Sequence, residues 1–485
     1  MNAILRATAI LSSSSLVSIL VGLVSAKAYA LLIGPAGTGR MGLLQGLIGL
    51  TGLIAALGIG TGLVRLGADA LGRADSARFA ALRQAAWCLA LLSGGVMALL
   101  LVLLRDPVSR LMLGGAAQAG AVWFAAAALI VNLASEVQTG ILNAHHRIAA
   151  LAKIGVINSV LGVLAGVAFV WRWGEAGIIA AVVIVPLIAW LSSRYFLDHE
   201  LPPLRERARA QEVIVATRSL LRFGLPYTLS MIAGTGVQLL IPVLVLKSLG
   251  EESVGYYRAA VTLSVTYLGF LLSAMALDYF PRVSAAGTYP EALRQLVNQQ
   301  HRVVMLLGVP MILGMLALAP YLIPLVYSSA FTPAIDIVEW QLIGDILKFS
   351  SWTMSFVILA RSGSLVFLLT EIIGGSVYLT SSWLGMHLFG LSGLGAAHLV
   401  TYAVYAFVVM RILAREIEFR PTAENVRWLA LSLLAAFAIH ALPSLGLAKP
   451  QFELATALAI ASLAVLGSLV ALKREMRSRY RVHPD

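Results

Sequence analysis

The chain has 485 residues, of which 59% are hydrophobic and only 12% are charged, and its mean hydropathy is +0.89. Soluble domains are about 45–50% apolar and about 25% charged, so this composition excludes an ordinary soluble protein and indicates a chain that lies in a lipid bilayer. The single cysteine, Cys88, excludes an internal disulfide framework and a cysteine-based zinc site. The formal net charge of +12 suggests nucleic acid at first sight, but in a membrane protein it is typical of basic loops that face anionic lipid. We therefore expect membrane lipids as partners and no nucleic acid.

The first predicted element imitates a secretory signal. Arg6 precedes an apolar run over residues 9–24, and Ala28-Tyr29-Ala30 resembles a cleavage site. Lys27, directly before that tripeptide, fits a cleavage site poorly, and the internal repeat described below includes this segment. We therefore expect an uncleaved transmembrane helix.

Fourteen apolar segments follow one another along the chain. Their length of about 20 residues is sufficient to span a bilayer as a helix. They lack alternation of period two, so they predict helices rather than the strands of a barrel. The segments cover residues 9–33, 41–64, 82–104, 119–142, 153–171, 176–196, 219–246, 254–278, 302–326, 336–360, 364–387, 393–413, 427–446 and 452–472.

The lysines and arginines predict the orientation in the membrane. If the N-terminus is cytoplasmic, the loops on that side hold 26 basic residues and the loops on the opposite side hold seven. Cytoplasmic loops of membrane proteins carry an excess of basic residues, and here the excess alternates from loop to loop. An even number of helices with both termini in the cytoplasm satisfies this pattern.

The chain also repeats itself after a shift of 216 positions, which places Gly34 on Gly250 and Gly174 on Gly390. These glycines stand at the ends of apolar segments in both copies, so they predict two related bundles of six helices with the same orientation. The predicted fold is an all-α integral membrane protein, with two six-helix bundles related by a pseudo-twofold axis along the membrane normal and two extra C-terminal helices, about 14 transmembrane helices in all. The predicted domains are residues 1–212, 213–426 and 427–485, the last with a basic cytoplasmic tail.

Common catalytic motifs are missing from the sequence. It has no GxxxxGK[ST], which argues against ATP hydrolysis, and no HExxH, GxSxG or paired CxxC. The histidines lack the spacing of metal ligands: His145 and His146 are adjacent, point about 100° apart on a helix, and are expected at a cytoplasmic helix end. We therefore expect no enzyme activity, no catalytic residue, no metal and no cofactor.

One apolar stretch, EWQLIGDILKFSSW at residues 339–352, carries an acid and a base, Asp345 and Lys348. An ionised group near the middle of a bilayer costs about 2.5–3.5 kcal/mol on insertion scales. Residues three apart share one face of a helix, so Asp345 and Lys348 can pair or can line a polar cavity together. Two interpretations stay open: a structural ion pair between packed helices, or part of a polar transport pathway.

Two other cations, Lys27 and Arg258, lie within apolar segments. Both can extend their long side chains to the membrane interface, which is a purely structural role. Alternatively they face a cavity together with Lys348, where three cations attract an anionic head group such as a pyrophosphate.

The acids within the segments, Glu136, Asp345 and Glu371, have two interpretations as well. They can be buried in ion pairs or as protonated carboxyls. Alternatively they bind a proton or a sodium ion that couples transport to a gradient. His398 also lies within a segment, and we expect it to be a neutral, packed histidine.

Residues 31–65 read LLIGPAGTGRMGLLQGLIGLTGLIAALGIGTGLVR, residues 220–237 read LLRFGLPYTLSMIAGTGV, and residues 254–260 read VGYYRAA. These stretches resemble the opening hairpin, the start of the second bundle and the next helix in polysaccharide-export flippases of the multidrug/oligosaccharidyl-lipid/polysaccharide exporter superfamily. WQLIGDILKFSSWTMSFVILAR at 340–361 and GLSGLGAAHLVTYAVY at 390–405 resemble Wzx-type translocases of O-antigen and enterobacterial common antigen. The resemblance covers about residues 1–415.

The resemblance implies a flippase with two bundles around a cationic cavity that opens alternately to either side. Its implied substrate is an undecaprenyl-pyrophosphate-linked oligosaccharide, an O-antigen or common-antigen repeat unit, which moves from the cytoplasmic to the periplasmic leaflet of the bacterial inner membrane. It assigns the cavity to Arg258, Lys348 and Asp345, then to Lys27 and Arg65. We expect coupling to an H⁺ or Na⁺ gradient, and the downstream polymerase is a candidate partner.

Alternatives remain within and outside this superfamily. Fourteen helices also suit the lipid II flippase branch. A multidrug cation antiporter needs an acidic cavity, whereas the repeated halves hold at least as many basic as acidic groups within their apolar segments. A membrane glycan polymerase or ligase needs a large periplasmic loop with catalytic residues, and no predicted outer loop is long enough.

Overall fold

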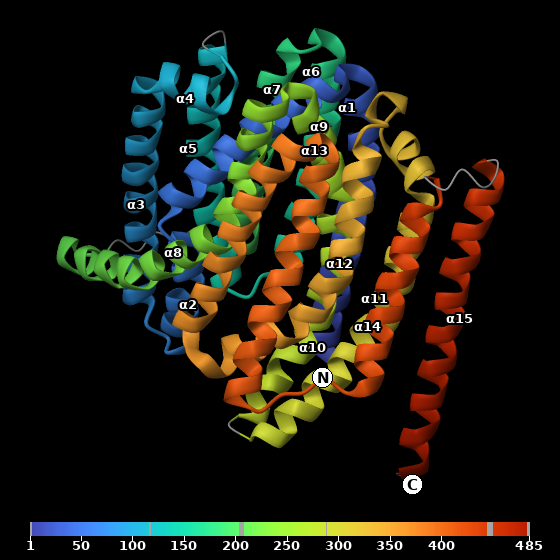
Figure 1. Ribbon diagram of the computed structural model, residues 1–485. Helices are drawn as coiled ribbons and strands as arrows, with labels where there is room; N and C mark the ends of the chain where they lie inside the picture. The colour runs from blue at the N-terminus through green and yellow to red at the C-terminus, as the bar shows by residue number, and fades with distance from the viewer. Residues whose placement is uncertain (1, 116–117, 203–207, 288, 444–449, 483–485) are drawn as a thin grey trace. The chain divides into compact units, whose positions relative to one another are not determined.

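The computed structural model describes residues 2–115, 118–202, 208–287, 289–443 and 450–482, which form helices joined by short turns, with no strand among them (Figure 1). The predicted fold class is confirmed, because the described chain is all-α and rich in long apolar helices. The helices are α1 (Asn2–Ala56), α2 (Ile59–Gly72), α3 (Ser76–Leu103), α4 (Arg105–Met112), α5 (Ala119–Ala144), α6 (Ile148–Trp173), α7 (Ala176–Glu200), α8 (Ala210–Leu249), α9 (Glu251–Val261), α10 (Leu268–Ala286), α11 (Pro290–Val326), α12 (Ala334–Val357), α13 (Gly363–Glu416), α14 (Ala423–Ala441) and α15 (Pro450–Val482). π-Helical turns at Thr262–Tyr267 and Ile358–Ser362 follow α9 and α12.

Nine helices in the described ranges are long and apolar enough to cross a membrane, or ten when the two bent parts of α8 are taken as one span. α1 includes the predicted segment 9–33 and the larger part of 41–64, whose remainder lies in α2, and α13 includes both 364–387 and 393–413. Each of these two helices is broken at a glycine. At Gly34 φ is 61° and at Gly390 φ is 60°, a conformation that glycine adopts without steric cost. The segments on either side of these breaks therefore behave as separate helices.

The predicted repeat extends to the backbone. Gly250 and Gly174, which the repeat pairs with Gly34 and Gly390, also have positive φ, at 88° and 57°. All four glycines therefore mark equivalent breaks in the two halves of the sequence.

Close helix contacts follow the same shift of 216 positions. Gly177 packs its Cα against the carbonyl oxygen of Phe169, and Gly393 packs against the carbonyl oxygen of Gly385. A side chain at either glycine would collide with that backbone. The repeat relates both partners of each contact, so equivalent residues in the two halves also make equivalent packing contacts.

The chain divides into two compact units, Met1–Gly255 and Tyr256–Asp485. The boundary between the predicted bundles, 1–212 and 213–426, lies at a different position from the boundary between these two units. One reason is that α8 packs against α1, α2 and α3 within the first unit. The predicted bundles are defined by the repeat rather than by compactness, and they stay a prediction.

Within the first unit, α5 packs against α2, α3 and α7, and α6 packs against α1 and α7. α1 ends at a sharp break, where Leu57 and Gly58 have φ of 48° and 66°. Gly224 of α8 lies directly against the carbonyl oxygen of Leu57. The break and the absence of a side chain at Gly224 together let α8 cross closely over the start of α2.

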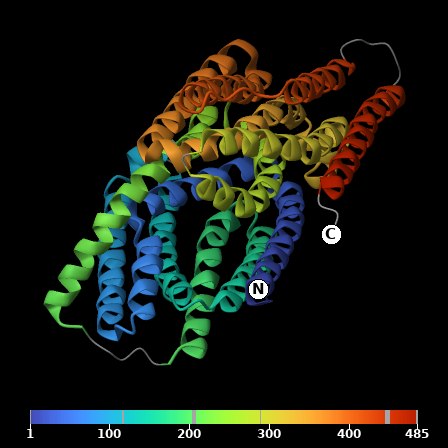
Figure 2. The same ribbon diagram turned by 90° about the horizontal axis from the view of Figure 1, so that it is seen from below.

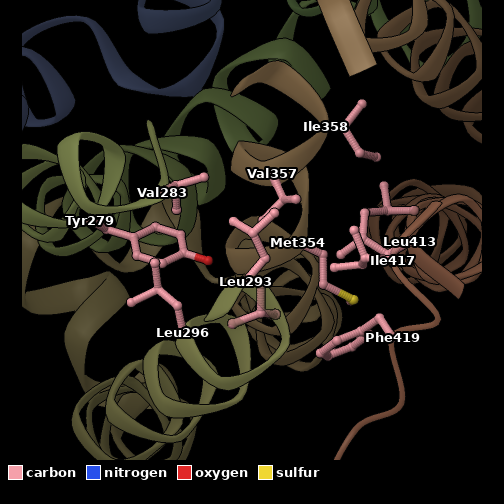
Figure 3. Packing of buried hydrophobic residues seen from close by; sticks show 12 residues of the cluster. Tyr279, Val283, Leu293, Leu296, Met354, Val357, Ile358, Leu413, Ile417 and Phe419 are labelled. Carbon is pink, nitrogen blue, oxygen red and sulfur yellow. The ribbon is translucent and has the colours of Figure 1, made fainter. Parts of the chain in front are cut away.

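Within the second unit, α12 lies between α11 and α13 and also contacts α14 (Figure 1). At one end of α12, a buried cluster joins α10 to α13, with Tyr279, Leu293, Met354 and Leu413 among its members (Figure 3). Lipid tails are as apolar as these side chains, so close van der Waals packing rather than the hydrophobic effect stabilises such contacts inside a bilayer.

α14 and α15 are attached to the second unit. At the start of α14, Asn425 donates to Asn298 of α11 at 3.0 Å, and Glu424 pairs with Arg302 at 2.9 Å. At its other end, His440 lies 2.7 Å from Glu339 of α12. α15 packs along α11 and α14 at the edge of the unit (Figure 2).

Candidate functional site

The candidate site is a buried polar cluster in the second unit, centred on α12. Residues 341–346 of α12 are all buried, and Gln341 and Asp345 are 0% exposed. Helical spacing places Gln341, Asp345 and Lys348 on one face of the helix. Such polar groups in an apolar segment need partners on the neighbouring helices.

The partners of Asp345 come from its own helix and from α13. Nε2 of His398 lies 3.0 Å from Oδ1 of Asp345, and Nζ of Lys348 lies 3.5 Å from the same oxygen. Lys348 also stands over the ring of Tyr402, with its Nζ 5.6 Å from the centroid, a cation–π geometry. The Lys348 side chain is 14% exposed, so the ammonium is largely withdrawn from solvent.

Gly344 makes this close approach of α12 and α13 possible. A Cβ at position 344 would lie 2.8 Å from Cδ2 of His398 and 3.0 Å from backbone atoms of Leu399. Real Cβ atoms essentially never approach a neighbour that closely. A residue other than glycine would therefore push His398 away from Asp345.

Tyrosines extend the cluster in two directions. Tyr402 packs against Tyr405, with ring centroids 6.3 Å apart, and the hydroxyl of Tyr405 donates to Glu371 at 2.8 Å. On the other side, His398 contacts the ring of Tyr378. The hydroxyl of Tyr378 lies 3.0 Å from that of Tyr257 on α9.

Two buried polar atoms of the cluster have no hydrogen-bond partner among the described residues: Oδ2 of Asp345 and Nε2 of Gln341. The oxygen of the Gln341 amide, Oε1, accepts a hydrogen bond from the hydroxyl of Ser264 at 2.7 Å. An unpaired buried polar group is costly, so each of these two atoms is a position where a water or an ion can bind.

Among the predicted site residues, the structure brings Asp345, Lys348 and Glu371 into one cluster, in which Glu371 is joined through tyrosines. Arg258 lies on α9 in the same unit, half-buried and beside Tyr327. A pairwise contact between Asp345 and Lys348 follows from their spacing of three on one helix.

The other predicted residues lie in the first unit. Lys27 is half-buried on α1. Arg65 is exposed on α2, with its guanidinium 4.9 Å from the ring centroid of Phe223. Glu136 of α5 reaches the start of α2, where the backbone N–H of Gly60 donates to its carboxylate. Glu136 therefore has a structural role as a cap for α2, since the first N–H groups of a helix lack intrahelical acceptors.

His398 is the functional candidate that sequence reasoning missed. It was expected to be a packed, neutral histidine, and it is indeed buried, at 4% exposed, but it also contacts the only fully buried acid of the described residues. One property of the sequence could have indicated this pairing. An acid within an apolar segment requires a hydrogen-bond donor, and few apolar segments contain a donor side chain such as His398. The adjacent histidines follow the end of α5 at Ala144, so the predicted helix end is confirmed, and its position on the cytoplasmic side stays a prediction.

Comparison with known proteins places the chain in a family. The family model described as "Polysaccharide biosynthesis protein" matches residues 28–336, well over half of the chain. The chain belongs to this family. Asp345, Lys348 and His398 lie outside the matched range, so the family match does not depend on them.

Two curated relatives have the same degree of similarity. The lipid III flippases of Escherichia coli (strain K12) and Shigella flexneri are each 24% identical over 405 residues, which cover 81% of this chain and 94% of the relative. The aligned region therefore includes most of both units.

Solved structures share the fold. A lipid II flippase, MurJ, in an inward closed conformation has a TM-score of 0.75 at 13% identity, covering 96% of this chain and 99% of that one. A multidrug resistance MATE family transporter of the MOP superfamily, in an inward-facing conformation, has a TM-score of 0.68 at 17% identity, covering 83% and 94%. At these identities the likeness shows the fold: the chain is a multi-pass membrane protein built like these transporters.

Proposed function

We propose that the protein is a flippase for a lipid-linked oligosaccharide. The structural observation that carries the proposal is Lys348, a lysine on α12 whose side chain is 14% exposed, contacts Asp345 and lies over the ring of Tyr402. A cation in that setting suits an anionic phosphate group, and tyrosine rings suit the sugars next to it. The similarity to two lipid III flippases along nearly their whole length supports the same substrate class.

In detail, the proposed substrate is an undecaprenyl-pyrophosphate-linked oligosaccharide of the O-antigen or common-antigen type, carried from the cytoplasmic to the periplasmic leaflet of an inner membrane. Lys348 and Arg258 hold the pyrophosphate, with Lys27 and Arg65 as further cations along its path. The polyprenyl chain stays in lipid while the two predicted bundles alternate in access. Both termini lie in the cytoplasm, as the distribution of basic residues predicts.

Coupling to an H⁺ or Na⁺ gradient is part of the proposal, and Asp345 and Glu371 are its candidate residues. Both acids belong to the cluster around Lys348. Glu136 is a weaker candidate for coupling than the other two, because its carboxylate already accepts from the backbone of α2.

Two alternatives have specific support. The fold of the lipid II flippase extends over 96% of this chain, so a related lipid diphosphate is a second candidate substrate. The fold of the multidrug transporter supports a cation antiporter. A drug cation needs an available carboxylate, however, and Asp345 is already in contact with Lys348 and His398.

Transport in proteoliposomes tests the proposal. Wild-type protein is expected to move a fluorescent undecaprenyl-pyrophosphate oligosaccharide between leaflets, and Lys348→Gln is expected to lower the rate about tenfold or more, because a charge-assisted contact contributes about 1.5–3 kcal/mol. Lys247→Gln, which removes an exposed lysine at the end of α8, is the matched control and should transport normally. Equal rates for Lys348→Gln and wild type would remove Lys348 from the site. Transport of drug cations alone would support the antiporter instead.

A further inference from the structure

The two carboxylate oxygens of Asp345 have different surroundings. Oδ1 is shared by Nε2 of His398 at 3.0 Å and Nζ of Lys348 at 3.5 Å. Oδ2 is buried without a hydrogen-bond partner among the described residues. Oδ2 is therefore an open position for a proton.

Lys348 depends on Asp345 for its counter-charge. Its described contacts are Oδ1 of Asp345 and the face of Tyr402. An anion that binds the ammonium competes with Asp345 for it. When the ammonium turns to the anion, an ionised Asp345 stays behind in the interior with its charge uncompensated, which is strongly unfavourable. A proton on Asp345 removes this penalty.

We propose that Asp345 and His398 together bind one exchangeable proton, and that this proton releases Lys348 to hold an anionic diphosphate head group. The inference rests on the proposed function and specifies how its binding site is regulated. Proton binding and anion binding then favour each other. Thermodynamic linkage requires that each raises the affinity for the other by the same factor.

The two other histidines that contact α12 have partners of their own. His301 of α11 is engaged with Ser350, at 2.8 Å, and His440 of α14 with Glu339, at 2.7 Å. Tyr378 and Tyr402 lie next to His398, and Tyr257, Tyr405 and Glu371 are linked to these two tyrosines. The elements packed against α12 also hold charged groups elsewhere along their length, including Arg294 and Arg302 on α11, Asp278 and Arg282 on α10, and Arg411 and Arg415 on α13.

Binding of a soluble probe at different pH values tests the inference on the full-length protein in detergent. The probe is a farnesyl-diphosphate-linked monosaccharide, a diphosphate diester whose own two charges do not change around neutral pH. Wild type is expected to bind it about tenfold more tightly for each unit that the pH falls through the titration of the site, which corresponds to one proton per anion. Calorimetry in buffers of different ionisation enthalpy should show the same proton uptake directly.

Variants locate the proton. Asp345→Asn should bind the probe at every pH as tightly as wild type does at acidic pH, and should show no proton uptake. His398→Gln should move the midpoint of the pH dependence. His440→Gln is the matched control, because it removes another histidine that contacts a carboxylate on α12, and it should leave the midpoint unchanged.

The outcomes separate the inference from the proposed function. If wild type binds the probe with an affinity that is independent of pH and without proton uptake, the inference is wrong while the proposed function stands. The same conclusion follows if Asp345→Asn keeps the full pH dependence. If folded wild type does not bind the probe at any pH, the proposed function fails and the inference fails with it. Should Asp345→Asn not fold, the calorimetry of wild type decides alone.

Discussion

At the scale of residues, the second unit contains an acid whose burial is complete and a base whose burial is nearly so. Asp345 is 0% exposed and the Lys348 side chain 14%. Breaking such a pair by removing one member leaves a charge without compensation, whereas replacing both by apolar groups can be close to neutral. The two charges should therefore behave as one energetic unit.

A double-mutant cycle measures the coupling free energy between Asp345 and Lys348. Lys348→Met alone is expected to destabilise the protein by about 3–5 kcal/mol, because ionised Asp345 then remains in the interior with only His398 beside it. Lys348→Met combined with Asp345→Leu should recover most of that loss. Thermal unfolding of the purified variants in detergent reports both changes. Additive effects in the double variant would show that the two charges are not coupled.

At the scale of elements, α12 and α13 are held together by a contact that tolerates no side chain. Gly344 lies against the imidazole of His398 and the backbone of Leu399. The two helices can thus approach closely, in the way that small residues permit between helices in membranes. A π-helical turn, Ile358–Ser362, follows α12, and such turns often occur at functional sites.

Gly344→Ala should separate the two helices. The added methyl group must displace His398, so we expect a loss of about 1–3 kcal/mol in stability and a weaker contact between His398 and Asp345. Gly314→Ala on α11 is the control, since a methyl group there meets nothing within 4 Å. That variant should be neutral or more stable by about 0.5–1 kcal/mol. Equal unfolding temperatures for the two variants would contradict the assigned contact.

At the scale of the whole molecule, part of the organisation could be predicted from sequence. Apolar length located the helices, and the repeated glycines Gly34 and Gly390 marked the breaks inside α1 and α13. The pair of Asp345 and Lys348 was accessible because its members are three apart on one helix. These are all local or periodic properties of a sequence.

The rest of the site depends on contacts between distant parts of the chain. His398 is 53 residues from Asp345, and its pairing follows from the packing of α13 on α12. Glu136 was indistinguishable by sequence from a coupling carboxylate, because its partner, the backbone N–H of Gly60, becomes free only where α1 breaks and α2 begins. A free backbone N–H donor cannot be recognised from the types of the residues in a sequence.

The attachment of the C-terminal helices to the second unit can be tested in the same full-length protein. Asn425 bonds both the backbone and the side chain of Asn298. Replacing it by leucine removes both bonds, leaves Oδ1 of Asn298 with the backbone N–H of Thr422 as its described donor, and should loosen the start of α14, at a cost of about 1–3 kcal/mol. Hydrogen exchange should then accelerate in α14 while the amides of α12 stay protected. Asn143→Leu, at an exposed position near the end of α5, is the control and should change neither helix. Unchanged exchange in α14 of the Asn425 variant would show that this polar contact does not hold the helix.

The border between the two compact units falls inside α9, after Gly255. A chain divided there would give one fragment that ends with five residues of α9, Glu251–Gly255, and another that begins with the remaining six, Tyr256–Val261. The second piece continues through the π-helical turn into α10, so the division would interrupt one continuous span, Glu251–Ala276. The first piece has only five residues, and isolated helices shorter than about 12–15 residues are marginal in water. Split-protein reconstitution, or separate expression of the two halves, should therefore use a division outside α9, so that each fragment inherits complete helices.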